Sequence, residues 1–191
     1  MKEEMDKIGQ DISLRDKAYE TIKQKIIRGL FNPGKQLPEK DLVNILNISP
    51  ILVREALSKL ERDGFVKIIP DKGAVVSRIT RQVVIDTFEI RENLEVLALQ
   101  KSICKIDEKD IDSLLQEFEE FNNHHSAINN TIHYITLDTR LHNLIIEKCG
   151  NKQLINYLAV LQQKSYWYRG VIFSDFAVHE MIHEDLGFLM L

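Results

Sequence analysis

Two segments of the sequence place histidine and acidic side chains at spacings that suit a bound metal ion. Asp138 and His142 are four residues apart in a helical pattern, so both side chains project from one helix face. A carboxylate and an imidazole on one face are good ligands for a divalent transition metal. An ion pair on a helix surface has the same spacing and is the alternative interpretation.

The second segment is His179-Glu180-Met181-Ile182-His183, which matches the pattern H-E-x-x-H of zinc protease helices. In such an enzyme the two histidines bind zinc and Glu180 acts as general base. However, only eight residues follow His183, and Gly187 is one place off the extended form of the motif. A zinc-dependent hydrolase is therefore the alternative hypothesis and not the favoured one. The sequence predicts no catalytic residues for the favoured function.

The first half of the chain predicts three helices and a hairpin. The helices are expected over 14–28, 38–46 and 49–63, and the strands over 65–69 and 74–77. Ser49 is expected to cap the third helix, Gly64 to end it, and Pro70 to Gly73 to form the turn between the strands. This order is the layout of a winged helix-turn-helix, here assigned to residues 13–78. Residues 1–12 are expected to form a flexible tail.

The second half of the chain shows only helical patterns. Apolar residues recur three and four apart near 81–104, 107–122, 128–149, 151–170 and 174–190, and Asp107 and Ser174 are expected N-caps. The predicted fold class is therefore mainly α, with an N-terminal winged helix-turn-helix and a C-terminal all-α helical bundle over residues 83–191.

Composition separates the same two halves. Residues 13–80 hold 13 Lys and Arg against 8 Asp and Glu, whereas residues 81–191 hold 10 against 17. A basic front half favours DNA binding, with chance scatter of surface charge as the alternative. No apolar run is long enough to span a bilayer, which predicts no membrane partner. The two cysteines, Cys104 and Cys149, have no metal or redox spacing, and the expected location is the cytoplasm.

The helix that Ser49 opens is the predicted DNA-reading element, since the second helix of such a motif enters the major groove. Arg54, one turn in, is expected to reach a phosphate or a guanine edge; the alternative is a surface pair with Glu55 or Asp63. Lys40 on the preceding helix would hold a phosphate. Lys72 and Gly73 at the wing tip would enter the minor groove, although a wing lysine is often only solvated.

The run "LPEKDLVNILNISPILVREALSKLERDGFVKIIPDKGAVV" resembles the winged helix of the GntR family of bacterial regulators. Its Pro33-Gly34 opening, the segment Val53 to Leu57 and the segment Asp63 to Val66 carry the resemblance, over about 60 residues of the chain. The resemblance implies DNA contacts at five positions, which are Lys40, Ser49, Arg54, Lys72 and Gly73. Pro50 departs from the family, which usually has Arg there. We still expect Pro50 and Ile51 at the interface, because Ile51 can contact a thymine methyl group.

The runs "FEIRENLEVLALQKSI" and "YITLDTRLHNLIIEKCGNKQLINYL" resemble the FCD ligand domain of FadR-like GntR regulators. The resemblance implies that Asp138 and His142 bind a divalent metal, such as zinc, nickel or manganese, and that His183 is the third ligand. A fourth would come from a further helix, so we expect the last helix of the domain to be missing after Leu191. Arg91 is expected to bind a carboxylate effector, with a structural pair to Glu95 or to another helix as the alternative.

Together these features predict a transcriptional regulator. Its partners would be double-stranded DNA and a small organic acid, and the acid would modulate operator binding. Helix-turn-helix readers usually dimerise to match two-fold operators, so a homodimer is expected.

Overall fold

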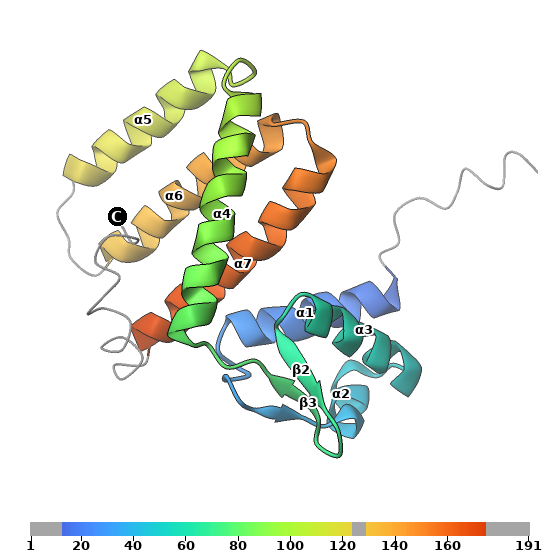
Figure 1. Ribbon diagram of the computed structural model, residues 1–191. Helices are drawn as coiled ribbons and strands as arrows, with labels where there is room; N and C mark the ends of the chain where they lie inside the picture. Colours follow the sequence, from blue (N-terminus) through green and yellow to red (C-terminus); the bar gives the residue numbers. More distant parts are fainter. Residues whose placement is uncertain (1–12, 124–128, 175–191) are drawn as a thin grey trace, which may run out of the picture. The chain divides into compact units, whose positions relative to one another are not determined.

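The computed structural model describes residues 13–123 and 129–174 (Figure 1). The chain divides into two compact units, one made of residues 1–84 and 163–191 and the other of residues 85–162. The last described helix, α7, therefore supplies residues to both units.

The described part of the first unit contains the winged helix-turn-helix that the sequence predicts. Its elements are α1 (Leu14–Ile27), β1 (Gln36–Leu37), α2 (Glu39–Leu46), α3 (Pro50–Arg62), β2 (Val66–Ile69) and β3 (Gly73–Val76). The strands form an antiparallel sheet in the order β1-β3-β2, in which Leu37 pairs with Ala74 and Lys67 with Val75. The two-residue strand β1 was not predicted, because two residues are too few to show an alternating pattern.

Local signals explain where α3 begins and ends. Asn47 takes the left-handed conformation after α2, with φ 51°, and Ser49 then accepts a hydrogen bond from the Leu52 amide at 3.5 Å. At the other end, Gly64 has φ 80°. The Gly64 amide donates to the Glu61 carbonyl, and the Phe65 amide donates to the Leu60 carbonyl, each at 2.9 Å. These two bonds form a Schellman motif, which ends the helix and turns the chain into β2.

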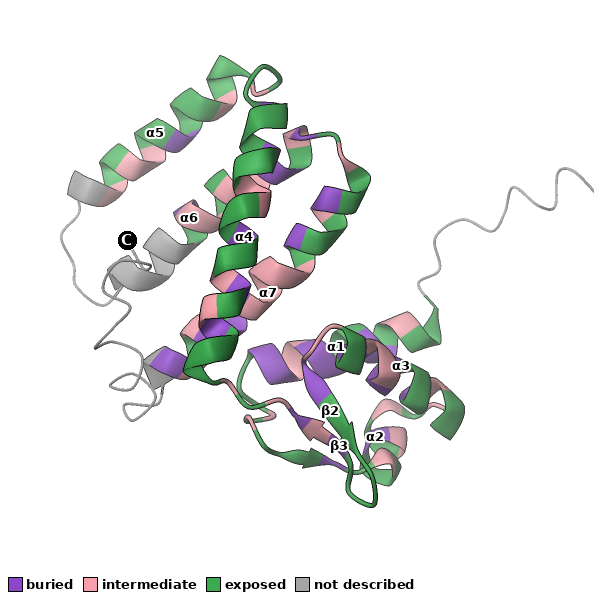
Figure 2. Cartoon of the chain, viewed as in Figure 1, coloured by how far each residue is buried: buried purple, intermediate pink, exposed green. Residues whose placement is uncertain are grey.

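The core of this unit lies where α1 and α3 face each other and the sheet (Figure 2). Its most deeply buried side chains are Ile22, Ile26, Val53, Leu60, Phe65, Val66 and Val76. Trp167 and Tyr168 of α7 are buried as well, and the Trp167 ring centroid lies 5.6 Å from that of Phe65. The end of α7 thus completes the core of the unit that carries α3.

The second unit is helical, as predicted. The helices α4 (Arg81–Ser102), α5 (Glu108–Asn123), α6 (Asn129–Lys148) and α7 (Lys152–Ser174) supply it, except for residues 81–84 of α4 and 163–174 of α7. Its core joins Ala98 of α4 to Ile146 of α6 and to Leu154 and Leu158 of α7. One prediction was wrong: Ser174 is the last residue of α7 rather than an N-cap, because the apolar pattern of α7 continues beyond residue 170. None of the described helices is long and apolar enough to cross a membrane.

Candidate functional site

The helix α3 presents the predicted DNA-contact side chains on an accessible face. Ile51 in its first turn is 65% exposed, and the Arg54 side chain is 67% exposed. Arg54 Nε donates to Glu39 Oε2 of α2 at 2.8 Å, a partner that the sequence reasoning did not consider. This bond lowers the pKa of Glu39 and raises that of Arg54. An exposed pair of this kind contributes little to stability, so Arg54 can exchange its partner for a phosphate at small cost.

The other predicted contacts lie at separate places on the same unit. Lys40 is exposed in the first turn of α2. Lys72 and Gly73 are exposed at the turn between β2 and β3, where Gly73 has φ 74° and Asp71 has φ 62°. The Gln36 side chain of β1 donates to the Lys72 carbonyl and so fixes the base of this turn. A bonded turn of this kind holds Lys72 at a defined position beside the sheet.

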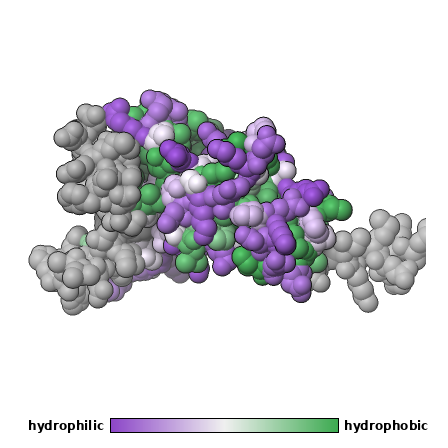
Figure 3. Space-filling model, turned by 90° about the horizontal axis from the view of Figure 1, so that it is seen from below, coloured by the Kyte–Doolittle hydropathy of each residue, from purple (hydrophilic) through white to green (hydrophobic). Residues whose placement is uncertain are grey.

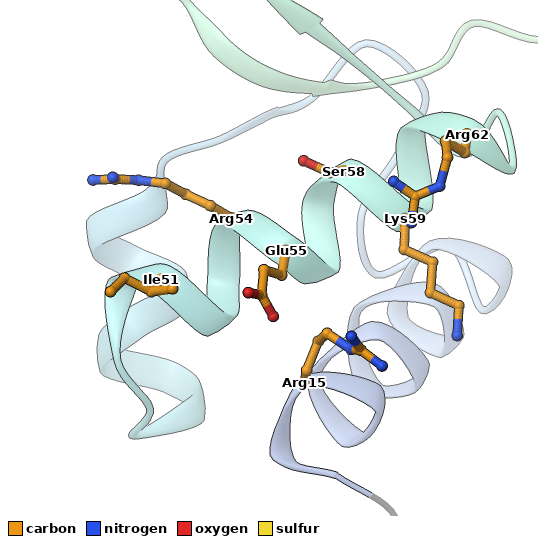
Figure 4. A pocket seen from close by; sticks show the side chains of 7 residues that line it. All are labelled: Arg15, Ile51, Arg54, Glu55, Ser58, Lys59 and Arg62. Atoms are coloured by element: carbon orange, nitrogen blue, oxygen red, sulfur yellow. The ribbon is translucent and has the colours of Figure 1, made fainter.

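A hollow of about 480 Å³ lies between the start of α1 and the exposed face of α3 (Figure 4). Its lining is mostly charged and consists of Arg15, Ile51, Arg54, Glu55, Ser58, Lys59 and Arg62. Figure 4 shows Glu55 and Lys59 extending from α3 toward Arg15 of α1, while Arg54 points away from them. In the face drawn in Figure 3, hydrophilic side chains likewise cover most of the described surface. Sequence reasoning missed Arg15, because nothing in the local pattern of α1 places it beside α3.

The second unit joins Asp138 and His142 in one cluster with two residues of α4. His142 Nε2 lies 3.4 Å from Asp138 Oδ1, and His142 Nδ1 lies 3.1 Å from Glu95 Oε2. The other oxygen of Glu95 accepts a hydrogen bond from Arg91 Nε at 2.7 Å. The cluster therefore alternates in charge along the order Arg91, Glu95, His142 and Asp138.

Burial and pairing shape the ionisation of this cluster. The Arg91 side chain is 7% exposed and that of Glu95 is 18% exposed. Hydrogen bonds to Asp138 and Glu95 raise the pKa of His142 to about 9, against the opposing effect of burial. Burial also opposes ionisation of Glu95, but the bond to His142 and the charge of Arg91 outweigh it and lower the Glu95 pKa. At a pH above the pKa of Glu95 and below that of His142, the charged imidazolium of His142 therefore lies between the carboxylates of Glu95 and Asp138.

Asp138 and His142 therefore lie together, as the metal-site prediction requires. Among the side chains that the structure describes, no group of three or more His, Cys, Asp or Glu has the arrangement of a metal site. The predicted third ligand, His183, lies outside the described residues, as do His179 and Glu180. Arg91 adopts the pair with Glu95 that was its alternative interpretation. Sequence reasoning missed the contact of Glu95 with His142, because these residues belong to different helices.

Comparison with known proteins assigns a family to each half of the chain. Residues 14–76 match the family model "Bacterial regulatory proteins, gntR family", and residues 86–186 match the FCD domain. The HTH-type transcriptional regulator YdhC of Bacillus subtilis is 30% identical over 73% of this chain and 62% of its own length. The HTH-type transcriptional repressor GlaR of Escherichia coli is 33% identical over 46% of this chain and 40% of its own length. The alignments thus span less than two thirds of these relatives.

Solved structures agree on the fold. The E. coli protein McbR/YncC superposes with a TM-score of 0.66 at 18% identity, covering 91% of this chain and 81% of that one. A GntR regulator from Rhodococcus sp. RHA1 gives a TM-score of 0.64 at 20% identity, covering 84% and 76%. The matching family model and the curated relatives describe regulators of transcription, and none of the matches supports a hydrolase. The chain belongs to the gntR family of bacterial regulatory proteins and carries the FCD domain of its FadR-like members.

Proposed function

We propose that this chain is a DNA-binding transcriptional regulator whose affinity for an operator responds to a small organic acid. The observation that carries the proposal is the accessible face of α3, where Ile51 and Arg54 are both more than half exposed. A helix with an exposed face and a flanking wing is suited to the major groove, which is about 12 Å wide. Ser49 and Pro50 at its start would lie nearest the groove, with Lys40 on a phosphate and Lys72 and Gly73 in the minor groove.

Binding to a labelled promoter fragment tests this function directly. Fluorescence anisotropy should give an affinity that falls steeply with salt, and tighter binding to the promoter than to a random duplex of equal length. A protein that binds both duplexes weakly and without salt dependence at low ionic strength would contradict the proposal.

A divalent metal fits the pair of Asp138 and His142. Two ligands about 2.1 Å from a tetrahedral metal are separated by about 3.4 Å. The observed distance from His142 Nε2 to Asp138 Oδ1 is also 3.4 Å. Glu95 on Nδ1 is the carboxylate partner that metal-binding histidines commonly have, because it fixes the ring and leaves Nε2 for the metal. His183 would be the third ligand, and zinc, nickel and manganese are the metals to test. A bound metal would supply positive charge and a coordination position for an acid.

Metal binding has a direct measurement that needs no DNA. Titrating the chelator-treated protein with zinc should raise its thermal unfolding midpoint, as a ligand bound only by the folded state must. The Asp138→Asn and His142→Asn variants should lose this rise. The matched control is Asp112→Asn, which removes an exposed carboxylate from α5 in the same unit. An equal rise in the wild-type protein and in the His142→Asn variant would contradict the site.

Arg91 is the proposed contact for the carboxylate of the effector. In the described part of the chain Glu95 is bound through the Nε donor of Arg91, and a guanidinium has five N–H donors in all. A small acid near His142 could therefore bind Arg91 without displacing Glu95. Isothermal titration with simple mono- and dicarboxylates would measure this, and an Arg91→Lys variant with unchanged affinity would contradict it.

A cytoplasmic homodimer is the proposed working form. In α4 the side chains of Ile90, Val96 and Leu99 are all more than 40% exposed. Apolar side chains of this number on one helix are typical of a surface that another chain covers. Sedimentation equilibrium would give the mass in solution, and a monomer at micromolar concentration would contradict the proposal.

A further inference from the structure

The hollow between α1 and α3 brings two cations to one anionic group. Arg15 Nη2 lies 3.3 Å from Asp16 Oδ2, and Lys59 Nζ lies 3.1 Å from Asp16 Oδ1. The side chains of Arg15 and Lys59 are 48% and 38% exposed. Exposed pairs of this kind hold their partners weakly. A second anion of higher charge can therefore join or replace the Asp16 carboxylate.

The position of Lys59 is fixed by more than this pair. Its ammonium lies 4.2 Å from the ring centroid of Tyr19, which is buried beneath it in α1. A cation over an aromatic face is stabilised by the electrons of the ring. Arg15 has five N–H donors and Lys59 has three, which leaves donors on both for a further acceptor. Arg15 and Lys59 thus form a partly ordered site that can bind an anion.

The direction of Lys59 on α3 decides what kind of anion can reach it. Arg54 and Lys59 are five residues apart, so they point about 140° away from each other around the helix axis. Figure 4 shows the same divergence, with Arg54 and Lys59 leaving opposite sides of α3. A helix in the major groove has a phosphate chain on each side. If Arg54 faces one chain, Lys59 and Arg15 face the other.

We infer that Arg15 and Lys59 bind the DNA phosphate backbone on the side of α3 opposite Arg54, so that α1 is part of the DNA interface. This inference rests on the proposed DNA-binding function and adds to it a residue from outside the helix-turn-helix. Glu55 lines the same hollow and carries a negative charge, so it disfavours binding of a phosphate by Arg15 and Lys59.

The test measures binding to a random-sequence 30-base-pair duplex over a range of salt concentrations, since phosphate contacts do not depend on sequence. Removing one phosphate contact should lower the slope of log K against log salt by about 0.9 and the affinity about fivefold at 0.15 M salt. We expect this for Arg15→Gln and for Lys59→Gln. Arg15→Lys should keep the wild-type slope, and Glu55→Gln should bind more tightly than wild type.

Lys17→Gln is the matched control, because Lys17 is exposed on α1 but does not line the hollow. Circular dichroism of each variant should give the wild-type unfolding midpoint to within a few degrees. If Arg15→Gln binds as Lys17→Gln does while Arg54→Gln is weakened, the inference is wrong and the proposed function stands. If the wild-type protein shows no salt-dependent binding, both are wrong.

Discussion

Two arginine–glutamate pairs, one in each compact unit, differ in how far water reaches them. In the winged helix, Arg54 and Glu39 form a pair whose side chains are 67% and 35% exposed. In the helical unit, Arg91 and Glu95 form a pair of nearly equal length whose side chains are 7% and 18% exposed. Exposed pairs are screened by water and salt and exchange partners readily, whereas buried pairs do not. The comparison teaches that the Arg54 pair leaves its guanidinium available for a polyanion, whereas the Arg91 pair holds a defined geometry.

The largest effect should follow from breaking the buried pair. Arg91→Met removes the guanidinium from the buried Glu95 carboxylate, leaving His142 as its partner, and should lower the free energy of unfolding by about 3–5 kcal/mol. Urea denaturation followed by circular dichroism measures this. The control is Arg54→Met, which breaks the exposed pair and should leave the free energy of unfolding close to that of the wild type. If the free energy of unfolding falls equally in the two variants, the buried pair is no more important for stability than the exposed one.

A dependence of stability on pH between 6 and 9 should arise from His142 in the helical unit. The folded-state pKa of His142 is about 9, above its ordinary value of 6.5. The folded state therefore binds the proton more tightly, and this stability is fully present below about pH 6.5 and is lost as the pH rises toward 9. The loss should reach about 3 kcal/mol.

Unfolding at pH 6 and at pH 9, with a chelator present, measures this dependence. The His142→Asn variant should lose most of it. A variant that keeps the full pH dependence would show that another group is responsible.

In the winged helix the main effect should be on DNA affinity instead of stability. Arg54→Gln should weaken operator binding by about 1–3 kcal/mol, because a base or phosphate contact is lost. Glu39→Gln should strengthen binding by a smaller factor, since it releases Arg54 from its intramolecular partner. Anisotropy titrations at one salt concentration compare both variants with wild type. Weaker binding by Glu39→Gln would mean that the pair orients Arg54 rather than restrains it.

The smallest effect should come from the start of α3. Ser49→Ala removes the cap on the Leu52 amide, which should cost about 1 kcal/mol or less of stability. Ser49→Asp keeps a capping oxygen and should restore the stability, although its charge should weaken DNA binding. Thermal unfolding and anisotropy titration separate the two effects. A stability loss in both variants would show that the cap does not act through its side-chain oxygen.

The sequence predicted what is local and missed what is distant. Ser49, Gly64 and the apolar spacing of α3 are signals within a few residues, and the helix begins and ends where they place it. The contact of Glu95 with His142 joins residues 47 positions apart on different helices, and no local pattern encodes it. The same holds for Arg15 beside Lys59. The pairing of Asp138 with His142 was predictable, because both residues lie on a single helix, one turn apart.

The position of Trp167 has a practical consequence, since it is the single tryptophan of the chain. Its indole is buried and packs on Phe65, which lies in the turn between α3 and β2. Any loosening of α7 from the winged helix would expose the indole to water and shift its emission to longer wavelength. The protein thus carries an intrinsic optical probe at the joint between its recognition helix and its last described helix. Effector titrations can be followed through this signal without attaching a dye.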